Sequence, residues 1–157
     1  MMAHLPEPKA VMRMLFSKLP FLLAIVVLAS ALHGQASARV SAIDGKNVRI
    51  VVQAQLKAFA ADNARQAFAL AAPGLQAQFG TPEKFMAMVR SSYPMVYAPA
   101  SVAFLQPESQ DADVIQRVRM SDDRGKPWLA IYSLQRQKDK SWRISGCVVV
   151  ESRGRFV

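Results

Sequence analysis

The amino-acid sequence predicts a domain of the α+β class, preceded by a secretory leader. Apolar residues recur at helical spacing through the first half of the domain. In the second half, polar and apolar residues alternate in short runs separated by turn residues. A helical block followed by strands with short connections is typical of the α+β class. We expect N-terminal helices packed on one face of an antiparallel four-stranded meander.

The first expected helix begins after Asn47, because asparagine is a good N-cap residue. Val48, Val52 and Phe59 belong to its apolar stripe. Gln55 interrupts this stripe, and a buried amide needs hydrogen-bond partners. Gln55 is therefore predicted either to bind the backbone of a neighbouring segment or to point into a pocket.

Two further helices are expected before the strands begin. Asp62 is predicted to cap a second, shorter helix, which should end at Pro73-Gly74. An irregular turn should follow. Thr81-Pro82 predicts the start of a third helix, because threonine caps and proline suits the first helical position. Tyr93-Pro94 should end that helix, since the residue before a proline avoids the helical region.

The expected strands occupy residues 101–106, 114–120, 128–136 and 142–150. Their connections are too short for a parallel crossover, so the strands should be antiparallel neighbours. Asp122 to Gly125 has the composition of a turn. Gly146 is predicted to mark either a β-bulge or a close approach of another backbone segment, and a bulge would change the face of the sheet on which Cys147 lies.

The leader comprises residues 1–38 and has the three parts of a Sec signal. Cations precede an apolar run, and Ala36-Ser37-Ala38 forms a cleavage site. The run is shorter than a membrane-spanning helix needs, so no stable membrane anchor is expected after cleavage. A start at Met12 would give a leader of more usual length. Residues 39–46 should be a flexible lead-in, 47–152 a single domain and 153–157 a tail, in a periplasmic or secreted protein.

The composition excludes several familiar site chemistries. Both histidines, His4 and His33, lie in the leader, so the exported part lacks the usual general base and the commonest zinc ligand. Cys147 is the one cysteine, and an internal disulfide is therefore impossible. The formal net charge is +9, but the cations are scattered, and together with export this argues against a nucleic-acid partner. No cofactor or metal motif is present.

Four motifs stand out in the domain: Val51-Val52-Gln53-Ala54-Gln55-Leu56, the Phe79-Gly80-Thr81-Pro82 turn, Trp128-Leu129-Ala130-Ile131-Tyr132 and Trp142-Arg143-Ile144-Ser145-Gly146-Cys147. They resemble an exported bacterial family called domain of unknown function 4864, which has no established activity and so implies no catalytic residue. The order of elements is similar to that of the nuclear transport factor 2-like superfamily, which includes both enzymes and non-catalytic pocket domains. That resemblance implies N-terminal helices packed in the concave face of a curved antiparallel four-stranded meander, as a cone with an internal pocket.

Six residues are candidates for lining such a pocket: Gln55, Tyr93, Tyr97, Trp128, Tyr132 and Cys147. Large amphipathic side chains with a few polar groups are the usual lining of a small-molecule site. The aromatic residues could equally be core and rim residues, and Cys147 could be a small buried apolar residue.

The favoured function is a non-catalytic module that binds a small ligand or an envelope protein. An alternative is an enzyme of the isomerase or dehydratase kind, with Tyr132, Tyr97 and Glu108 handling protons. A second alternative is an interaction module, for instance a homodimer, that uses the outer sheet face. For that face the alternation predicts an apolar patch of Ile115, Leu129, Ile131 and Val149.

Overall fold

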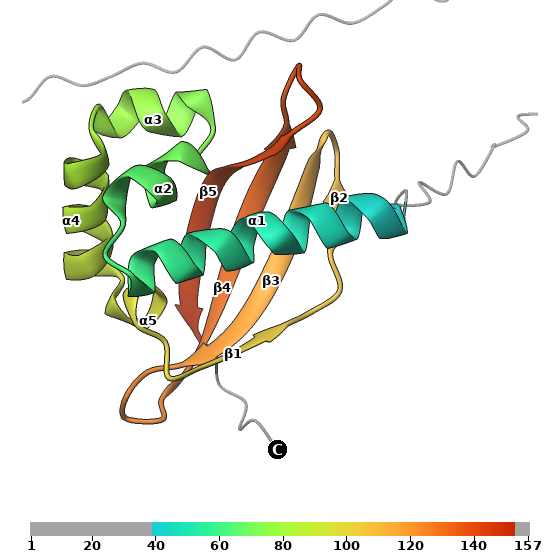
Figure 1. Cartoon of the computed structure of the whole chain (residues 1–157). Helices are drawn as coiled ribbons and strands as arrows, with labels where there is room; N and C mark the ends of the chain where they lie inside the picture. Colours follow the sequence, from blue (N-terminus) through green and yellow to red (C-terminus); the bar gives the residue numbers. More distant parts are fainter. Residues whose placement is uncertain (1–38, 153–157) are drawn as a thin grey trace, which may run out of the picture. The chain divides into compact units, whose positions relative to one another are not determined.

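The computed structural model describes residues 39–152, in which helices precede a curled antiparallel sheet (Figure 1). The helices are α1 (Ala42–Ala60), α2 (Ala64–Ala69), α3 (Pro73–Phe79), α4 (Pro82–Ser92) and α5 (Pro94–Tyr97). The strands are β1 (Ser101–Phe104), β2 (Glu108–Gln110), β3 (Asp113–Ser121), β4 (Pro127–Arg136) and β5 (Trp142–Glu151). The predicted α+β class is confirmed. The predicted leader (1–38) and tail (153–157) lie outside the described residues.

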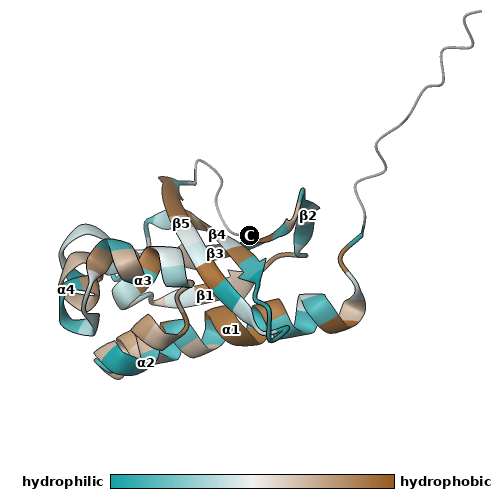
Figure 2. Ribbon diagram, turned by 90° about the horizontal axis from the view of Figure 1, so that it is seen from above, coloured by the Kyte–Doolittle hydropathy of each residue, from teal (hydrophilic) through white to brown (hydrophobic). Residues whose placement is uncertain are grey.

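The sheet has the order β1-β3-β4-β5, and β2 pairs with the same edge of β3 as β1 does. The sequence analysis missed β2, which has three residues and too little alternation to be recognised. Helix α1 lies along one face of the sheet, while α2, α3 and α4 gather at one end, beside β5 (Figures 1 and 2). β5 is therefore the strand that faces the helical end of the domain.

Helix α1 begins at Ala42 with Ser41 as its N-cap, so the prediction that residues 39–46 are a flexible lead-in was wrong from Ala42 onward. Gly45 lies within this helix, where the chain approaches Pro107. A Cβ atom on Gly45 would lie 3.0 Å from Pro107 Cγ. The predicted apolar stripe is confirmed, since Val48, Val52 and Phe59 are all buried.

Two helix boundaries also differ from the predictions. Asn63, not Asp62, caps α2, and its side chain accepts a hydrogen bond from the Gln66 amide. Pro73 begins α3 instead of ending a helix, since proline suits a first turn as well as a stop. The predicted start at Thr81 is confirmed, and so is the end at Tyr93, where the short α5 follows.

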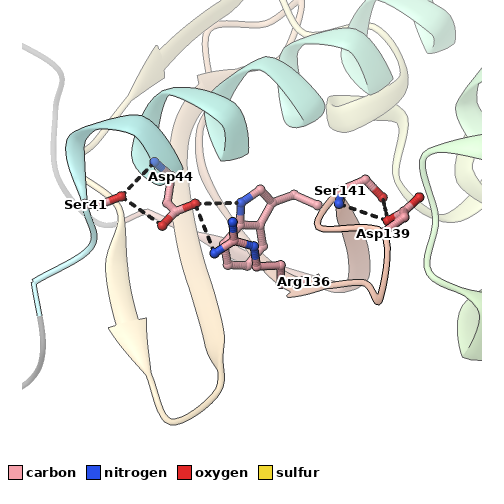
Figure 3. A network of polar contacts seen from close by, with 6 residues as sticks. Ser41, Asp44, Arg136, Asp139 and Ser141 are labelled. Atoms are coloured by element: carbon pink, nitrogen blue, oxygen red, sulfur yellow. Dashed lines mark hydrogen bonds and ion pairs between the residues drawn. The ribbon is translucent and has the colours of Figure 1, made fainter.

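The start of α1 is joined to the β4–β5 hairpin through Asp44 (Figure 3). Its carboxylate accepts a hydrogen bond from the Ser41 hydroxyl at 2.8 Å and one from Trp142 Nε1 at 3.2 Å. Arg136 Nη1 lies 3.8 Å from the same carboxylate. These contacts lower the pKa of Asp44, and the hydrogen bond from Ser41 has the largest effect. The carboxylate therefore connects segments that are far apart in the sequence.

We expect the Asp44 contacts to make stability depend on pH in the acid range. Because the folded pKa of Asp44 is lowered, its contribution is present above the unfolded pKa of about 3.9 and is lost as pH falls below it. Asp44→Asn should therefore flatten the fall in thermal midpoint between about pH 5 and pH 2. Asp123→Asn, in the exposed β3–β4 turn, is the matched control. Equal pH profiles for the two variants would contradict the assignment.

Candidate functional site

A pocket of about 370 Å³ lies between α3 and α4 on one side and β5 on the other. None of its lining residues carries a formal charge at neutral pH. They are Gln55, Phe59, Leu75, Gln78, Phe79, Phe85, Met88, Val89, Tyr93, Val96, Tyr132, Ile144 and the run Ser145–Val149. Such a mainly apolar lining with a few polar groups suits an uncharged ligand or an apolar part of a larger partner.

An aromatic cluster forms the helical wall of the pocket, with Phe85 of α4 at its centre. The Phe85 ring lies 6.0 Å from that of Phe59, 5.8 Å from that of Phe68 and 5.3 Å from that of Phe79, measured between ring centroids. Each of these partners belongs to a different helix. The four-ring cluster therefore holds α1, α2, α3 and α4 together around the pocket.

The opposite wall depends on a β-bulge in β5. Ser133 and Leu134 of β4 pair with Gly146 and Ile144, so Ser145 is the extra residue. The Ser145 hydroxyl donates a hydrogen bond to the Ser133 carbonyl at 3.1 Å. Of the two interpretations of Gly146, the structure has the bulge, with the neighbouring Ser145 as its extra residue. Because of it, Cys147 lies opposite Tyr132 on the helix-covered face, as Ile144 does opposite Leu134.

The bulge also corrects the predicted outer patch. Val149 pairs with the fully buried Ala130 and packs against the core, so its assignment to the outer face was wrong. Val148 and Val150 take that face instead, and they are 60% and 43% exposed. Simple alternation along β5 cannot predict this, because the extra residue exchanges the two faces downstream of it.

Four of the six predicted pocket residues line the pocket together: Gln55, Tyr93, Tyr132 and Cys147. The structural interpretation of Gln55 is confirmed, since its amide Nε2 donates a hydrogen bond to the Ala67 carbonyl at 3.2 Å, and the residue also borders the pocket. The sequence analysis missed the α3 residues Leu75 and Phe79 as pocket residues. Phe79, in the motif Phe79-Gly80-Thr81-Pro82, was a usable signal.

Tyr97 and Trp128 do not line this pocket. The Tyr97 hydroxyl donates a hydrogen bond to Asp62 at 3.1 Å, and Asp62 also pairs with Arg90. Trp128 Nε1 donates to Asp122 at 3.0 Å in the β3–β4 turn. Both side chains thus fix connections at the rim of the domain. Tyr97 instead lines a shallower groove of about 600 Å³ beside β1.

Tyr132 and Cys147 are the titratable pair at the base of the pocket. The Tyr132 hydroxyl is buried and makes no hydrogen bond of ordinary geometry among residues 39–152. The Cys147 thiol, a weak hydrogen-bonding group, lies beside it. Burial raises the pKa of the Cys147 thiol to about 12, and burial and then the Cys147 thiol raise the pKa of Tyr132. Both groups are therefore neutral at physiological pH.

We expect the buried Cys147 thiol to make the fold sensitive to alkali. The unfolded thiol ionises first, because its pKa is near the ordinary value while the folded pKa is about 12. The free energy of unfolding should therefore fall above about pH 9, and the Cys147 thiol contributes at most about 1.4 kcal/mol per pH unit to that fall. Urea unfolding from pH 8 to pH 11 checks this against Cys147→Ala. If the free energy of unfolding of Cys147→Ala fell with pH as steeply as that of the natural protein, the raised pKa of Cys147 would be refuted.

Among residues 39–152, no group of three or more histidine, cysteine, aspartate or glutamate side chains lies close enough to hold a metal ion. Glu108, proposed above as a proton-handling group, pairs with Arg117 on the neighbouring strand and does not line the pocket. None of the described helices is long and apolar enough to cross a membrane.

Comparisons with known proteins place the chain in a family. A search of the curated proteins found no match. Among solved structures, the chain is similar to an NTF-2-like protein of unknown function from Burkholderia xenovorans LB400, with 15% identity and a TM-score of 0.44. The similarity covers 71% of this chain and 88% of that one. The model of one family matches residues 41–157, which is most of the chain. The chain therefore belongs to the family described as Domain of unknown function (DUF4864).

Proposed function

We propose that this protein is an exported, non-catalytic module that binds a neutral apolar ligand, or an apolar group of a partner, in the pocket between α3, α4 and β5. The observation that supports binding is the uncharged lining around a volume of about 370 Å³. Ligand pockets are usually of this size or larger and mainly apolar. The leader over residues 1–38 supports the exported part of the proposal.

The polar groups of the pocket support binding more than catalysis. A general base must be able to lose or hold a proton near the working pH. The raised pKa values of Tyr132 and Cys147 keep both groups protonated there. Neutral hydroxyl and thiol groups in an apolar wall can orient a ligand by weak polar contacts.

The test uses a neutral fluorescent probe, N-phenyl-1-naphthylamine, titrated into the protein. Leu75→Glu should weaken its binding at least tenfold, because Leu75 of α3 is a partly buried wall residue and a carboxylate there would have to be desolvated by the probe. Ile50→Glu is the matched control, since Ile50 is 49% exposed on α1 and lines no pocket described above. Equal loss in both variants, or no binding by the natural protein, would reject the proposal.

A second candidate function is association through the outer sheet face. Val148 and Val150 are exposed there, beside the partly buried Leu129 and Ile131. Contiguous apolar residues on a surface often mark an interface. Sedimentation equilibrium should show a dimer that Val148→Lys converts to a monomer. A natural protein that stays monomeric at high concentration would exclude this candidate.

A further inference from the structure

The outer edge of β5 has main-chain groups that the described part of the sheet does not use. The Ser152 N–H group donates a hydrogen bond to the Pro127 carbonyl at 3.0 Å. This bond shows which residues of β5 direct their main-chain groups towards β4 and which direct them away. In an antiparallel pair, every second residue bonds to the neighbouring strand. Val150 and Val148 therefore bond towards β4, and the N–H and C=O groups of Cys147 and Val149 point away from it.

The same edge already accepts main-chain partners before the bulge. Ile144 N–H donates to the Leu70 carbonyl at 2.9 Å, and the Ile144 carbonyl accepts from Ala72 N–H at 2.7 Å. The pairing is parallel and limited to one bridge, Ala71 with Ile144. Pro73 then starts α3 and carries the chain away. Beyond the bulge, no hydrogen bond among residues 39–152 reaches the outward groups of Cys147 and Val149.

The unused edge opens into the pocket. Five consecutive residues, Ser145–Val149, line it, although successive residues of a strand point to opposite faces. A strand can contribute such a run when its edge, and not one face, borders the cavity. Across the pocket lie the apolar side chains of Leu75, Phe79 and Met88. A molecule in the pocket could therefore contact the outward main-chain groups of β5 and the apolar wall at the same time.

The edge also lacks the usual protection. Exposed edge strands are normally guarded by charged residues, prolines or very short length. The run Cys147-Val148-Val149-Val150 has neither charge nor proline. Its bulge lies upstream of the run, next to the single bridge with Ala71, and so does not protect the rest of the edge. An open apolar edge of this kind is a template for strand addition.

We propose that the pocket receives an extended segment of a partner polypeptide, which adds to β5 as a further strand. Its main chain bonds to Cys147 and Val149, and one of its uncharged apolar side chains enters the pocket between Leu75, Phe79 and Met88. This inference rests on the proposed function and names the partner class of the same site. Main-chain bonding supplies affinity, and the pocket selects an apolar side chain.

The test measures displacement of N-phenyl-1-naphthylamine by a capped pentapeptide of alternating threonine and valine. Two further peptides carry N-methyl groups, one on both valines and the other on the two outer threonines. Strand addition uses the N–H groups of alternate residues only. One methylated peptide should therefore bind at least tenfold more weakly than the parent, and the other should bind within about threefold of it. Which peptide loses affinity identifies a parallel or an antiparallel addition.

The possible results separate the two proposals. If the probe binds and the parent peptide fails to displace it, strand addition is wrong while the proposed apolar site stands. Equal affinity of the two methylated peptides also overturns strand addition, because it shows that side chains alone are bound. If the probe itself does not bind, the proposed function fails together with the inference. In the expected case, amide hydrogen exchange at Cys147 and Val149 should slow at least tenfold when the parent peptide is present.

Discussion

Phe85→Ala is expected to lower the free energy of unfolding by about 3–5 kcal/mol. Phe85 is 4% exposed, and its ring contacts three other phenylalanines, each from a different helix. Removing the ring enlarges the adjoining pocket where four helices meet, and the cost is large because the three neighbouring rings lose their shared contact. Urea unfolding followed by far-ultraviolet circular dichroism measures the loss.

The matched control for Phe85→Ala is Ile50→Ala, also on a helix but 49% exposed. Surface substitutions of this kind usually change stability by less than about 0.5 kcal/mol. A cost for Phe85→Ala no greater than that of the control would contradict the role of the aromatic cluster. Phe85→Leu should retain part of the stability, because it leaves a smaller cavity.

Tyr132→Ala is the second substitution with a large expected effect, again about 3–5 kcal/mol, because Tyr132 is 1% exposed in the central part of β4. Tyr132→Phe should not lower the free energy of unfolding. Its hydroxyl is buried without a hydrogen bond of ordinary geometry, and removing an unsatisfied polar group is neutral or favourable. We expect stability to be unchanged or to rise by up to about 2 kcal/mol.

Urea unfolding of the two Tyr132 variants separates packing from hydrogen bonding. A loss of more than about 1 kcal/mol in Tyr132→Phe would show that the hydroxyl has a partner that stabilises the fold. Loss in Tyr132→Ala alone would show that the ring matters through packing. Under the proposed function, Tyr132→Phe should also bind the neutral probe at least as tightly as the natural protein, since it makes the pocket more apolar.

Much of the fold could be predicted because its elements follow simple periodic patterns. Val48, Val52 and Phe59 recur at helical spacing, and the alternation in β3 correctly places Val114, Val118 and Met120 in the core. Gln116 continues the same row and is fully buried, with its Nε2 bonded to the Leu105 and Arg117 carbonyls. It was overlooked because polarity alone suggested exposure.

The errors arose where contacts distant in sequence decide the local structure. Gly45 lies inside α1, where a Cβ atom would meet Pro107, and that contact is distant in sequence. The earlier start of α1 had a local signal that was missed, since Ser41 caps the helix and accepts a hydrogen bond from the Asp44 amide. Asp62 adopts a positive φ of 52° and contacts Arg90 and Tyr97 instead of capping α2. Asp62 and Asn63 are both good caps, so local sequence could not choose between them.

The pocket was predictable only in part, for the same reason. Gly146 indicated a bulge, but its position in the ladder with β4 had to be known before Cys147 and Val149 could be assigned to the inner face. Trp128 was a reasonable candidate by type, and its indole is directed elsewhere by a hydrogen bond to Asp122. Residue type predicted which side chains could line a pocket, while the tertiary contacts determined which ones do.

A neutral apolar group that occupies the proposed site would lie against Tyr132 and Cys147 and should shield the Cys147 thiol from alkylation. Because Cys147 is the one cysteine in the chain, its alkylation by iodoacetamide reports on that wall once the rate through global unfolding, known from urea unfolding with and without the probe, is subtracted. The rate at pH 9 should fall at least fivefold when N-phenyl-1-naphthylamine is saturating, since the probe covers the thiol. An unchanged rate at full probe occupancy would show that the probe binds elsewhere and would contradict the account.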